Sequence, residues 1–452
     1  MLLAALLIAQ AAVLDPNDRI RELEARVAAL EAAKAQPASA PAASTPALVQ
    51  SSQALDVREP PFAQGDFTWM NGSNRQPSSL LGLGPLTLAL YVDMFYAWDF
   101  AQPVDHTIFE STVASRHNEV AVNLASIGID LTGLDGPTGR VYIQYGTNVE
   151  TVYGQDRTSK RGYFLSSVPF LQQIGAGWHF HWFHGVNIEL GIFPSYIGLE
   201  SYLPQENWNY TKQFLSDFTP YYLAGLRAQL YFTAQMKLEL WLVNGWQTFS
   251  EWHEARAGGY FFNYRPNDAL SLVNAAYFGQ DAQSDPHGVR YYIDSNLQLR
   301  YYRGSHIKSA AFSLVFDIGY EQRSNAASGL MTGIGFAHRV EWSAMWATTV
   351  RGDIYYDQTQ ALVAPLPVGS PYTLPVTGAF LGGGFTATLD FLPSPWIIFR
   401  AEYVHRNTNI PYLSGHGGIT GPSGVAATDP SSFKPDLRKS DDRFIVNATV
   451  RL

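Results

Sequence analysis

Charged side chains recur at every second position in several long segments of this sequence. In residues 290–302, Asp294 and Arg300 fall on one face of an extended chain, and Ile293 and Leu297 fall on the other. Side chains two positions apart share a face in a β-strand. Acids and bases in such a row can line a water-filled space and steer dissolved ions or polar solutes. The pattern therefore predicts strands whose charged faces together line a water-filled space.

The alternation assigns a set of charged side chains to this polar face. They are Arg227, Lys237, Glu239, Asp294, Arg300, Asp317, Arg351, Asp353, Arg400 and Glu402. Because bases and acids are nearly balanced on the wall, we expect weak charge selectivity. The formal net charge of −9 shifts that expectation only slightly toward cations.

Reactive and metal-binding groups are sparse. The sequence has no Cys, which excludes disulfides, thiolate metal sites and Cys nucleophiles. His179, His181 and His184 lie close together, but His184 falls in a predicted turn near Trp182. An aromatic and polar belt at a membrane interface is therefore favoured over a metal site. Since no spacing marks a nucleophile with its base, we expect no enzyme, no metal and no cofactor.

Length and composition narrow the class of protein. Of 452 residues, 15% are charged and 14% are aromatic. The charged share is well below the ~25% of ordinary soluble domains. The sequence lacks the apolar runs of about 20 residues that a helical membrane protein contains. Its acidic balance argues against a nucleic-acid partner.

The elements that carry these two-faced patterns are long. Alternation over about 10 residues or more predicts strands well above the mean of about 5–6 residues in soluble proteins. The pattern is weakest near Phe261 and Phe336. The sixteen predicted strands are centred near Val92, Val122, Ile143, Ile174, Ile188, Leu226, Leu240, Phe261, Asn274, Gln298, Phe316, Phe336, Val350, Phe385, Phe399 and Asn447.

Connections between the predicted strands alternate in length. Those at residues 133–136, 234–235 and 265–268 are short, whereas those at 148–168 and 194–220 are long. Turns on one edge and loops on the other are typical of a transmembrane β-barrel.

The predicted fold class is therefore all-β, a closed antiparallel transmembrane β-barrel of about sixteen strands over residues 86–452. A short N-terminal α-helix in the periplasm is expected to precede it. A secreted β-sandwich or a propeller also alternates, but such folds usually have shorter strands and lack the short–long rule.

Three segments precede the predicted barrel. Residues 1–12 are apolar and small, as in a secretory signal peptide that is removed. Residues 15–35 are predicted to form a short helix that either joins copies of the chain as a coiled coil or stays solvated alone. An Ala/Pro/Ser-rich linker and lead-in, residues 36–85, follows. The heptad seam of the helix comprises Ile20, Leu23, Val27 and Leu30.

Several sequence blocks resemble a known family. They are RHNEVAVNLA, VNIELGIFPSYIGLES, QENWNYTKQFLSDFTPYY, AGLRAQLYF, LWLVNGWQTF and RGDIYYDQ. Together they are similar to the β-barrel porin-2 (OmpL-like) family over most of residues 86–452. This resemblance implies an outer-membrane barrel that conducts solutes and has no catalytic residues.

The long connection at residues 194–220 is the third outer loop of the predicted barrel. In general porins the corresponding loop folds inward and narrows the channel. Here it would set the size cutoff and charge preference, with Arg227 facing its acids. The alternative is a loop that packs over the rim. Its charged residues are Glu200, Glu206, Lys212 and Asp217.

We therefore predict a porin of the bacterial outer membrane that allows passive diffusion of small hydrophilic solutes or ions through a water-filled barrel. Its expected partners are outer-membrane lipid, these solutes and further copies of the chain in a homotrimer. Two alternatives are an adhesin or structural barrel with an occluded lumen, and a hydrolase embedded in the barrel. Bilayer conductance separates the porin from the first alternative, and hydrolase assays separate it from the second.

Overall fold

A computed structural model gives the fold of the chain, and all described residues belong to the unit Arg58–Leu452. The predicted signal peptide, the predicted helix with its seam and the start of the linker lie outside the described residues. The structure describes residues 59–70, 82–108, 110–132, 135–153, 156, 158, 168–251, 254–282, 285–363, 378–419 and 434–452.

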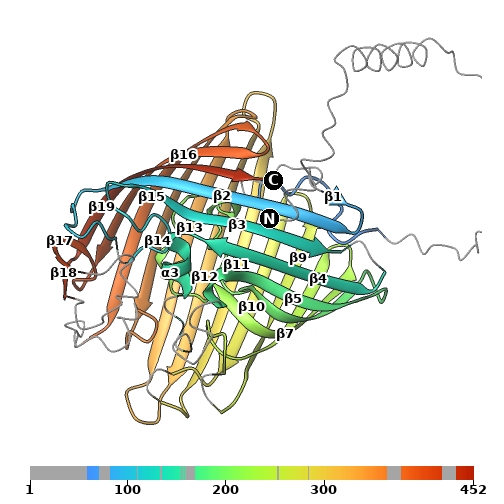
Figure 1. The fold of residues 1–452 in the computed structure, drawn as a ribbon, viewed down its shortest axis with the longest axis horizontal. Helices are drawn as coiled ribbons and strands as arrows, with labels where there is room; N and C mark the ends of the chain where they lie inside the picture. The colour runs from blue at the N-terminus through green and yellow to red at the C-terminus, as the bar shows by residue number, and fades with distance from the viewer. Residues whose placement is uncertain are drawn as a thin grey trace, which may run out of the picture. The chain divides into compact units, whose positions relative to one another are not determined.

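Sixteen long strands form the wall of a barrel (Figure 1). Each strand is antiparallel to both neighbours, and their order around the wall follows the sequence from β2 to β16 and then β19. The wall strands are β2 (Leu86–Asp99), β3 (Val120–Leu131), β4 (Pro137–Tyr145), β5 (Leu171–Phe180), β6 (Val186–Pro194), β7 (Tyr222–Thr233), β8 (Met236–Val243), β9 (Ala257–Asn267), β10 (Leu270–Gly279), β11 (Val289–Arg303), β12 (Ser309–Gln322), β13 (Gly329–Glu341), β14 (Trp346–Asp357), β15 (Phe380–Ser394), β16 (Ile397–Thr408) and β19 (Ser440–Arg451).

The first and last wall strands close the barrel. β19 pairs with β2 along most of its length, and the main chains of Leu90 and Leu452 exchange two hydrogen bonds of 2.9 and 2.8 Å. A two-residue strand, β1 (Gly82–Leu83), pairs with the start of β2. Closure satisfies the backbone N–H and C=O groups that an open sheet edge would leave unpaired in hydrocarbon.

The prediction of a closed sixteen-strand barrel is confirmed. Every predicted strand centre lies within an observed strand, and the two weakest, near Phe261 and Phe336, belong to β9 and β13. The connections also alternate as predicted. Those at residues 132–136 and 234–235 are short, and the one at 195–221 is long.

The two faces of the wall have opposite polarity. On β13 the outward Ile334 is 54% exposed and the inward Arg339 only 2%. On β14 the outward Ile354 is 56% exposed and the inward Arg351 only 2%. This reverses the pattern of a soluble protein, in which charges face outward and large apolar side chains are buried. The outward face therefore matches an apolar surrounding such as lipid.

Short elements occupy the connections. Within the described residues, no helix is both long enough and apolar enough to cross a membrane. The short elements are the helices α3 (Thr147–Tyr153) and α4 (Phe214–Asp217), the 3-10 helices η2 (Val168–Phe170) and η3 (Pro204–Glu206), and the hairpin of β17 (Leu413–Ile419) with β18 (Lys434–Arg438).

Candidate functional site in the barrel interior

The connection between β6 and β7, residues 195–221, packs against the inward face of the wall. We call it loop 3. It contains η3 and α4, and most of its side chains are buried. α4 lies against β13, β14 and β15. Loop 3 thus fills part of the space that the strands enclose.

Arg351 on β14 holds the middle of loop 3. Its guanidinium lies 2.9 Å from the carboxylate of Glu200. It also donates hydrogen bonds to the carbonyl oxygens of Thr211 and Lys212. Charge-assisted hydrogen bonds of this kind are about twice as strong as neutral ones. Arg351, predicted as a wall residue, is therefore covered by the loop that it binds.

Arg400 on β16 holds the part of loop 3 around η3. It donates to the carbonyl oxygens of Pro204 and Asn207 at 2.6 and 2.8 Å. Asp390 accepts from Arg400 at 3.2 Å and from Arg339 at 2.6 Å. The carboxylate between two arginines keeps both guanidinium groups oriented in a buried region.

Carboxylates on the wall bind the backbone N–H groups of loop 3. Glu402 accepts from the N–H groups of Tyr210 and Thr211 at 2.6 and 2.8 Å. Asp353 accepts from the N–H of Phe214 at 2.8 Å, at the start of α4. Buried backbone N–H groups without a partner are costly. These carboxylates therefore provide hydrogen-bond acceptors for backbone N–H groups in a segment that is not part of a β-sheet.

The charged residues of α4 and its approach are also buried. Asp217 lies 2.8 Å from Arg406 of β16. The ammonium of Lys212 lies 3.9 Å from the centre of the Tyr221 ring. Burial lowers the pKa of Lys212 to about 8, although the charges of Asp217 and Glu200 oppose this shift.

Glycines on the inward face make room for loop 3. A Cβ atom at Gly335 on β13 would overlap the side chain of Gln213, and one at Gly259 on β9 would overlap the hydroxyl of Tyr196. That hydroxyl donates to the carbonyl oxygen of Ala276 at 2.9 Å. The close approach of loop 3 to the wall therefore requires the smallest residue at these positions.

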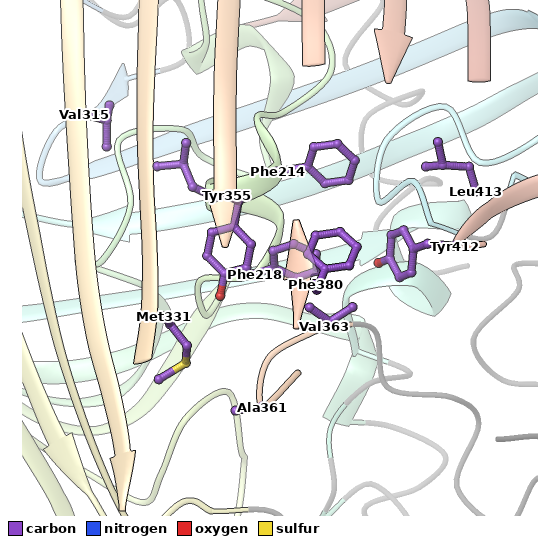
Figure 2. Packing of buried hydrophobic residues seen from close by; sticks show 11 residues of the cluster. Phe214, Phe218, Val315, Met331, Tyr355, Ala361, Val363, Phe380, Tyr412 and Leu413 are labelled. Atoms are coloured by element: carbon purple, nitrogen blue, oxygen red, sulfur yellow. The ribbon is translucent and has the colours of Figure 1, made fainter. Parts of the chain in front are cut away.

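An apolar cluster forms where α4 meets the wall (Figure 2). The ring centroid of Phe218 lies 4.7 Å from that of Tyr355 and 5.7 Å from that of Phe380. Tyr412, from the connection between β16 and β19, lies 5.2 Å from Phe380. The cluster anchors loop 3 by apolar burial as well as by charge. Its other buried members are Phe214, Leu215, Val315, Met331, Ala361, Val363 and Leu413.

Several predicted wall residues form ion pairs with other wall residues, across strands or along one strand. Arg227 on β7 lies 2.6 Å from Glu189 on β6. Lys237 on β8 lies 2.8 Å from Glu239 on the same strand. These pairs lie on β6–β8, whereas α4 packs against β13, β14 and β15.

The remaining predicted acids have different environments. Asp294 on β11 accepts from the N–H of Gly198 in loop 3 at 3.2 Å, and it faces Asp317 across the β11–β12 pair. Glu206 on η3 lies 3.9 Å from Arg451 near the end of β19. All three acids thus lie on the inward face or on loop 3.

Residues 59–70, which precede the barrel, lie at its short-turn end. The N–H of Phe62 donates to the carbonyl of Ala234 in the β7–β8 turn at 2.5 Å. The indole N–H of Trp69 donates to the carbonyl of Asp268 in the β9–β10 turn at 2.8 Å. We call this stretch the inner segment. Its sequence lacks the periodicity that marks the strands, so its position could not be predicted.

The inner segment meets loop 3 inside the barrel. The indole N–H of Trp208 donates to the carbonyl of Trp69 at 2.8 Å. Both rings pack against Ala311 and Ala337 on the wall. The guanidinium of Arg300, a predicted wall residue, lies 5.5 Å from the centre of the Trp69 ring. Two segments remote in sequence therefore touch within the lumen.

Open space remains on the β7–β11 side. A cavity of about 370 Å³ lies between loop 3 and this wall, and its lining includes Arg227, Lys237 and Arg265. Arg265 was not among the predicted site residues, because the connection pattern placed it in a turn. The sequence did indicate its position, because Arg265 continues the two-residue spacing of Phe261 and Asn263 and so lies on the same face of the strand.

The predicted histidines have ordinary polar partners. His179 lies 2.7 Å from Asn187, and His181 lies 2.6 Å from Asp135. The ring of His184 contacts a backbone carbonyl of the inner segment. Across the part of the chain that the structure describes, no cluster of three or more His, Asp or Glu side chains could hold a metal ion.

No curated protein matches the sequence. The structure is similar to OmpT, an outer membrane protein of Vibrio cholerae, with 9% identity, 83% of this chain and 100% of that chain covered, and a TM-score of 0.48. The anion-selective porin from Comamonas acidovorans gives 8% identity, coverage of 81% and 99%, and a TM-score of 0.49.

A third structure, Salmonella typhi OmpF in complex with daunomycin, gives 11% identity, coverage of 81% and 97%, and a TM-score of 0.47. One protein-family model also matches the sequence. The model described as "Putative beta-barrel porin-2, OmpL-like" matches residues 85–448, which is most of the barrel. The chain belongs to the β-barrel porin-2, OmpL-like family.

Proposed function

We propose that this protein is a porin of the bacterial outer membrane through which small hydrophilic solutes or ions diffuse passively. The observation that carries the proposal is the inverted polarity of the wall. Its outward side chains are apolar and exposed, and its inward side chains are charged or polar. A barrel with this polarity suits lipid outside and water-borne solutes inside.

We propose further that loop 3 narrows the path. Support comes from its burial against β13–β16 and from the open cavity left along β7–β11. In this arrangement one group of charges fixes the loop, and another faces the solutes. The fixing group comprises Glu200, Lys212, Asp217, Arg351, Asp353, Arg400 and Glu402. The solute-facing group comprises Arg227, Lys237 and Glu239, which line the open cavity. Asp294 and Arg300 instead bind loop 3 and the inner segment, and we place Glu206 and Asp317 elsewhere along the path.

Planar-bilayer recordings of the purified full chain test the porin. We expect discrete steps of ohmic conductance, and reversal potentials in asymmetric salt then give the charge selectivity. Deleting residues 207–215 tests the narrowing, because it removes the part of loop 3 held by Arg400 and Glu402. The deletion should enlarge the conductance step. An unchanged step would contradict a role of loop 3 in narrowing.

The assembly and the N-terminal region belong to the same proposal. The protein would sit in outer-membrane lipid as a homotrimer, with its N-terminal helix in the periplasm. The supporting sequence feature is the heptad seam of Ile20, Leu23, Val27 and Leu30. Neither a cofactor nor a nucleic acid is expected to take part.

One observation favours a second candidate, a structural barrel or adhesin with an occluded lumen. The inner segment and loop 3 meet through Trp69 and Trp208 inside the barrel. If both stay in place, the remaining path is confined to the β7–β11 side.

Replacing Trp69 with Ala distinguishes the two candidates in the same bilayers. For a conducting porin, the native chain gives steps and Trp69→Ala gives the same or larger steps. For an occluded barrel, the native chain is silent and the variant opens it.

A further inference from the structure

The cavity along β7–β11 combines rings with cationic and amide groups. Its lining includes the aromatic side chains of Tyr196, Trp241 and Phe261, and the amides of Gln229 and Asn263. A volume of about 370 Å³ is in the range of pockets that hold small molecules.

Arg265 stands at the short-turn end of this cavity. It lies on β9, and its N–H main-chain group donates to the carbonyl of Gln235 in the β7–β8 turn. Its guanidinium carbon lies 4.6 Å from the centre of the Phe62 ring and 5.1 Å from that of Phe67. Both rings belong to the inner segment. Rings at this distance favour a cation but leave its N–H groups without acceptors.

The guanidinium of Arg265 is not neutralised. Among the described residues, no carboxylate lies within ion-pair distance of it, and its Nε is buried without a hydrogen-bond partner. A buried polar group without a partner is costly. An arginine offers five N–H donors, so the site has unused capacity for an anion.

The carboxylates nearby are committed to other groups. Glu239 binds Lys237 at 2.8 Å and accepts from the indole N–H of Trp241 at 3.0 Å. Asp268 lies 2.5 Å from Arg300. Asp66 accepts from the main chain and hydroxyl of Thr68. The unmatched charge at this end of the cavity is therefore positive.

We propose that the cavity is a binding site for small organic carboxylates, with Arg265 receiving the carboxylate and the aromatic lining receiving the apolar body. Lys237 lies on the neighbouring strand, opposite Asn263 in the register, and adds a second cation on the route. This inference rests on the proposed passage of solutes through the lumen. Small organic carboxylates would bind at this site as they pass through the lumen.

The geometry suits a ligand that is charged at one end only. From Lys237 to Trp241 the strand advances about 13 Å at ~3.3 Å per residue. Arg265 lies at the Lys237 end, since β8 begins and β9 ends beside the short turns. A carboxylate with a planar ring can then contact the guanidinium and reach toward the aromatic lining.

Calorimetric titration of the full chain in detergent tests the site without requiring an open channel. Benzoate is the probe, and benzamide, its neutral isostere, is the control ligand. We expect benzoate to bind and benzamide to bind at least about tenfold more weakly, because only benzoate forms a charge-assisted pair. Arg265→Gln should weaken benzoate binding by about tenfold as well, and Arg265→Lys by less.

Arg303→Gln is the matched control, because it removes an exposed arginine at the same end of the barrel. It should leave benzoate binding unchanged. Equal binding of benzoate and benzamide, or equal binding by the native chain and Arg265→Gln, would overturn the inference.

Bilayer recordings separate this inference from the proposed function. Benzoate should reduce the current through the native chain more than through Arg265→Gln. Conductance without any benzoate effect would leave a porin and refute the site. Benzoate binding without conductance would support the site and refute the porin. Heat-modifiable gel mobility shows that each variant is folded.

Discussion

At the scale of single residues, the interior is organised by ion pairs that would be weak on a surface but are buried here. Arg351, Arg400 and Arg339 are almost inaccessible to solvent, and each contacts loop 3 or an acid that orients it. Breaking a buried pair is costly because the remaining charge stays desolvated. The wall charges nearest loop 3 therefore control its position more than they control ions in solution.

Arg351→Met should release loop 3 from the wall. The change removes the pair with Glu200 and the donors to two loop carbonyls. Loss of one partner of a buried pair costs about 3–5 kcal/mol, and about 3 kcal/mol raises the open population roughly a hundredfold. Limited proteolysis of the folded barrel should show much faster cleavage within residues 195–221. The same cleavage rate in the variant and the native chain would contradict this.

Arg256→Met is the control for that experiment. Arg256 is exposed and bonds to Asn244 outside loop 3. We expect its cleavage pattern to match that of the native chain, since exposed polar contacts contribute little to stability.

Lys212 should make the closure of loop 3 depend on pH. Burial lowers its pKa from 10.5 to about 8. Between these values the released loop binds more protons than the packed loop, so packing strengthens as pH rises, by up to about 1.4 kcal/mol per pH unit. The cleavage rate of the native chain relative to Lys212→Met should therefore fall from pH 8 to pH 10.5. A constant ratio would show that Lys212 does not titrate with the loop.

At the scale of elements, the strands were predictable because each one alternates apolar and polar side chains. The apolar side chains face outward on every strand, and the polar ones face the lumen. β12 places Leu314, Phe316 and Ile318 outward and Asp317 inward. A shift by one residue would bring a charge to the lipid face. The patterns of β9 and β13 are weaker, but each of these strands pairs on both sides with a strand whose pattern is clear, and this pairing sets its register.

The lipid face of β13 gives a prediction with an internal control. Ile334 lies near the middle of the strand and Leu330 near its end, and both point outward and are exposed. Arginine at the middle of a spanning strand costs roughly 2–4 kcal/mol, but only about 0–1 kcal/mol near the interface. Ile334→Arg should therefore fold less efficiently into phospholipid vesicles than Leu330→Arg. Equal folding yields would contradict a membrane-spanning β13.

The contents of the barrel were less predictable than its wall. Loop 3 has charges and rings whose partners lie on strands far away in sequence, such as Glu402 for Tyr210. No periodicity encodes such pairings. The inner segment has no alternation at all, and Arg265 was assigned to a turn because the pattern of connection lengths placed a short connection at residues 265–268. Period and spacing predict elements, whereas interior contacts depend on how the closed sheet brings its inward faces together.

At the scale of the whole molecule, closure of the barrel creates the interior in which loop 3 and the inner segment pack. Once β19 joins β2, every inward side chain faces the same enclosed space. Loop 3 then forms hydrogen bonds with donors and acceptors on β13–β16, and the inner segment forms hydrogen bonds with the short turns of β7–β10. The β7–β11 side is left with open volume and an unmatched cation. This asymmetry leaves the open volume of the lumen on one side of the barrel.

The last prediction concerns the association of complete molecules. If the heptad seam joins copies of the chain, a charge in the seam should separate them, because an acid at such a position is desolvated against its own copies. We expect the double variant Leu23→Asp, Val27→Asp to shift from trimer to monomer in native mass spectrometry from detergent. Its barrel should keep the heat-modifiable mobility of the native chain.

Ala25→Asp with Ala28→Asp is the matched control for the seam. It adds the same charges to the same segment, but at positions away from the seam. The control should therefore keep the native mass. A seam variant that stays trimeric would assign the association to the barrel wall, where large apolar side chains are exposed on the outward face. If both double variants dissociated, added charge alone, and not its place in the heptad, would be what separates the copies.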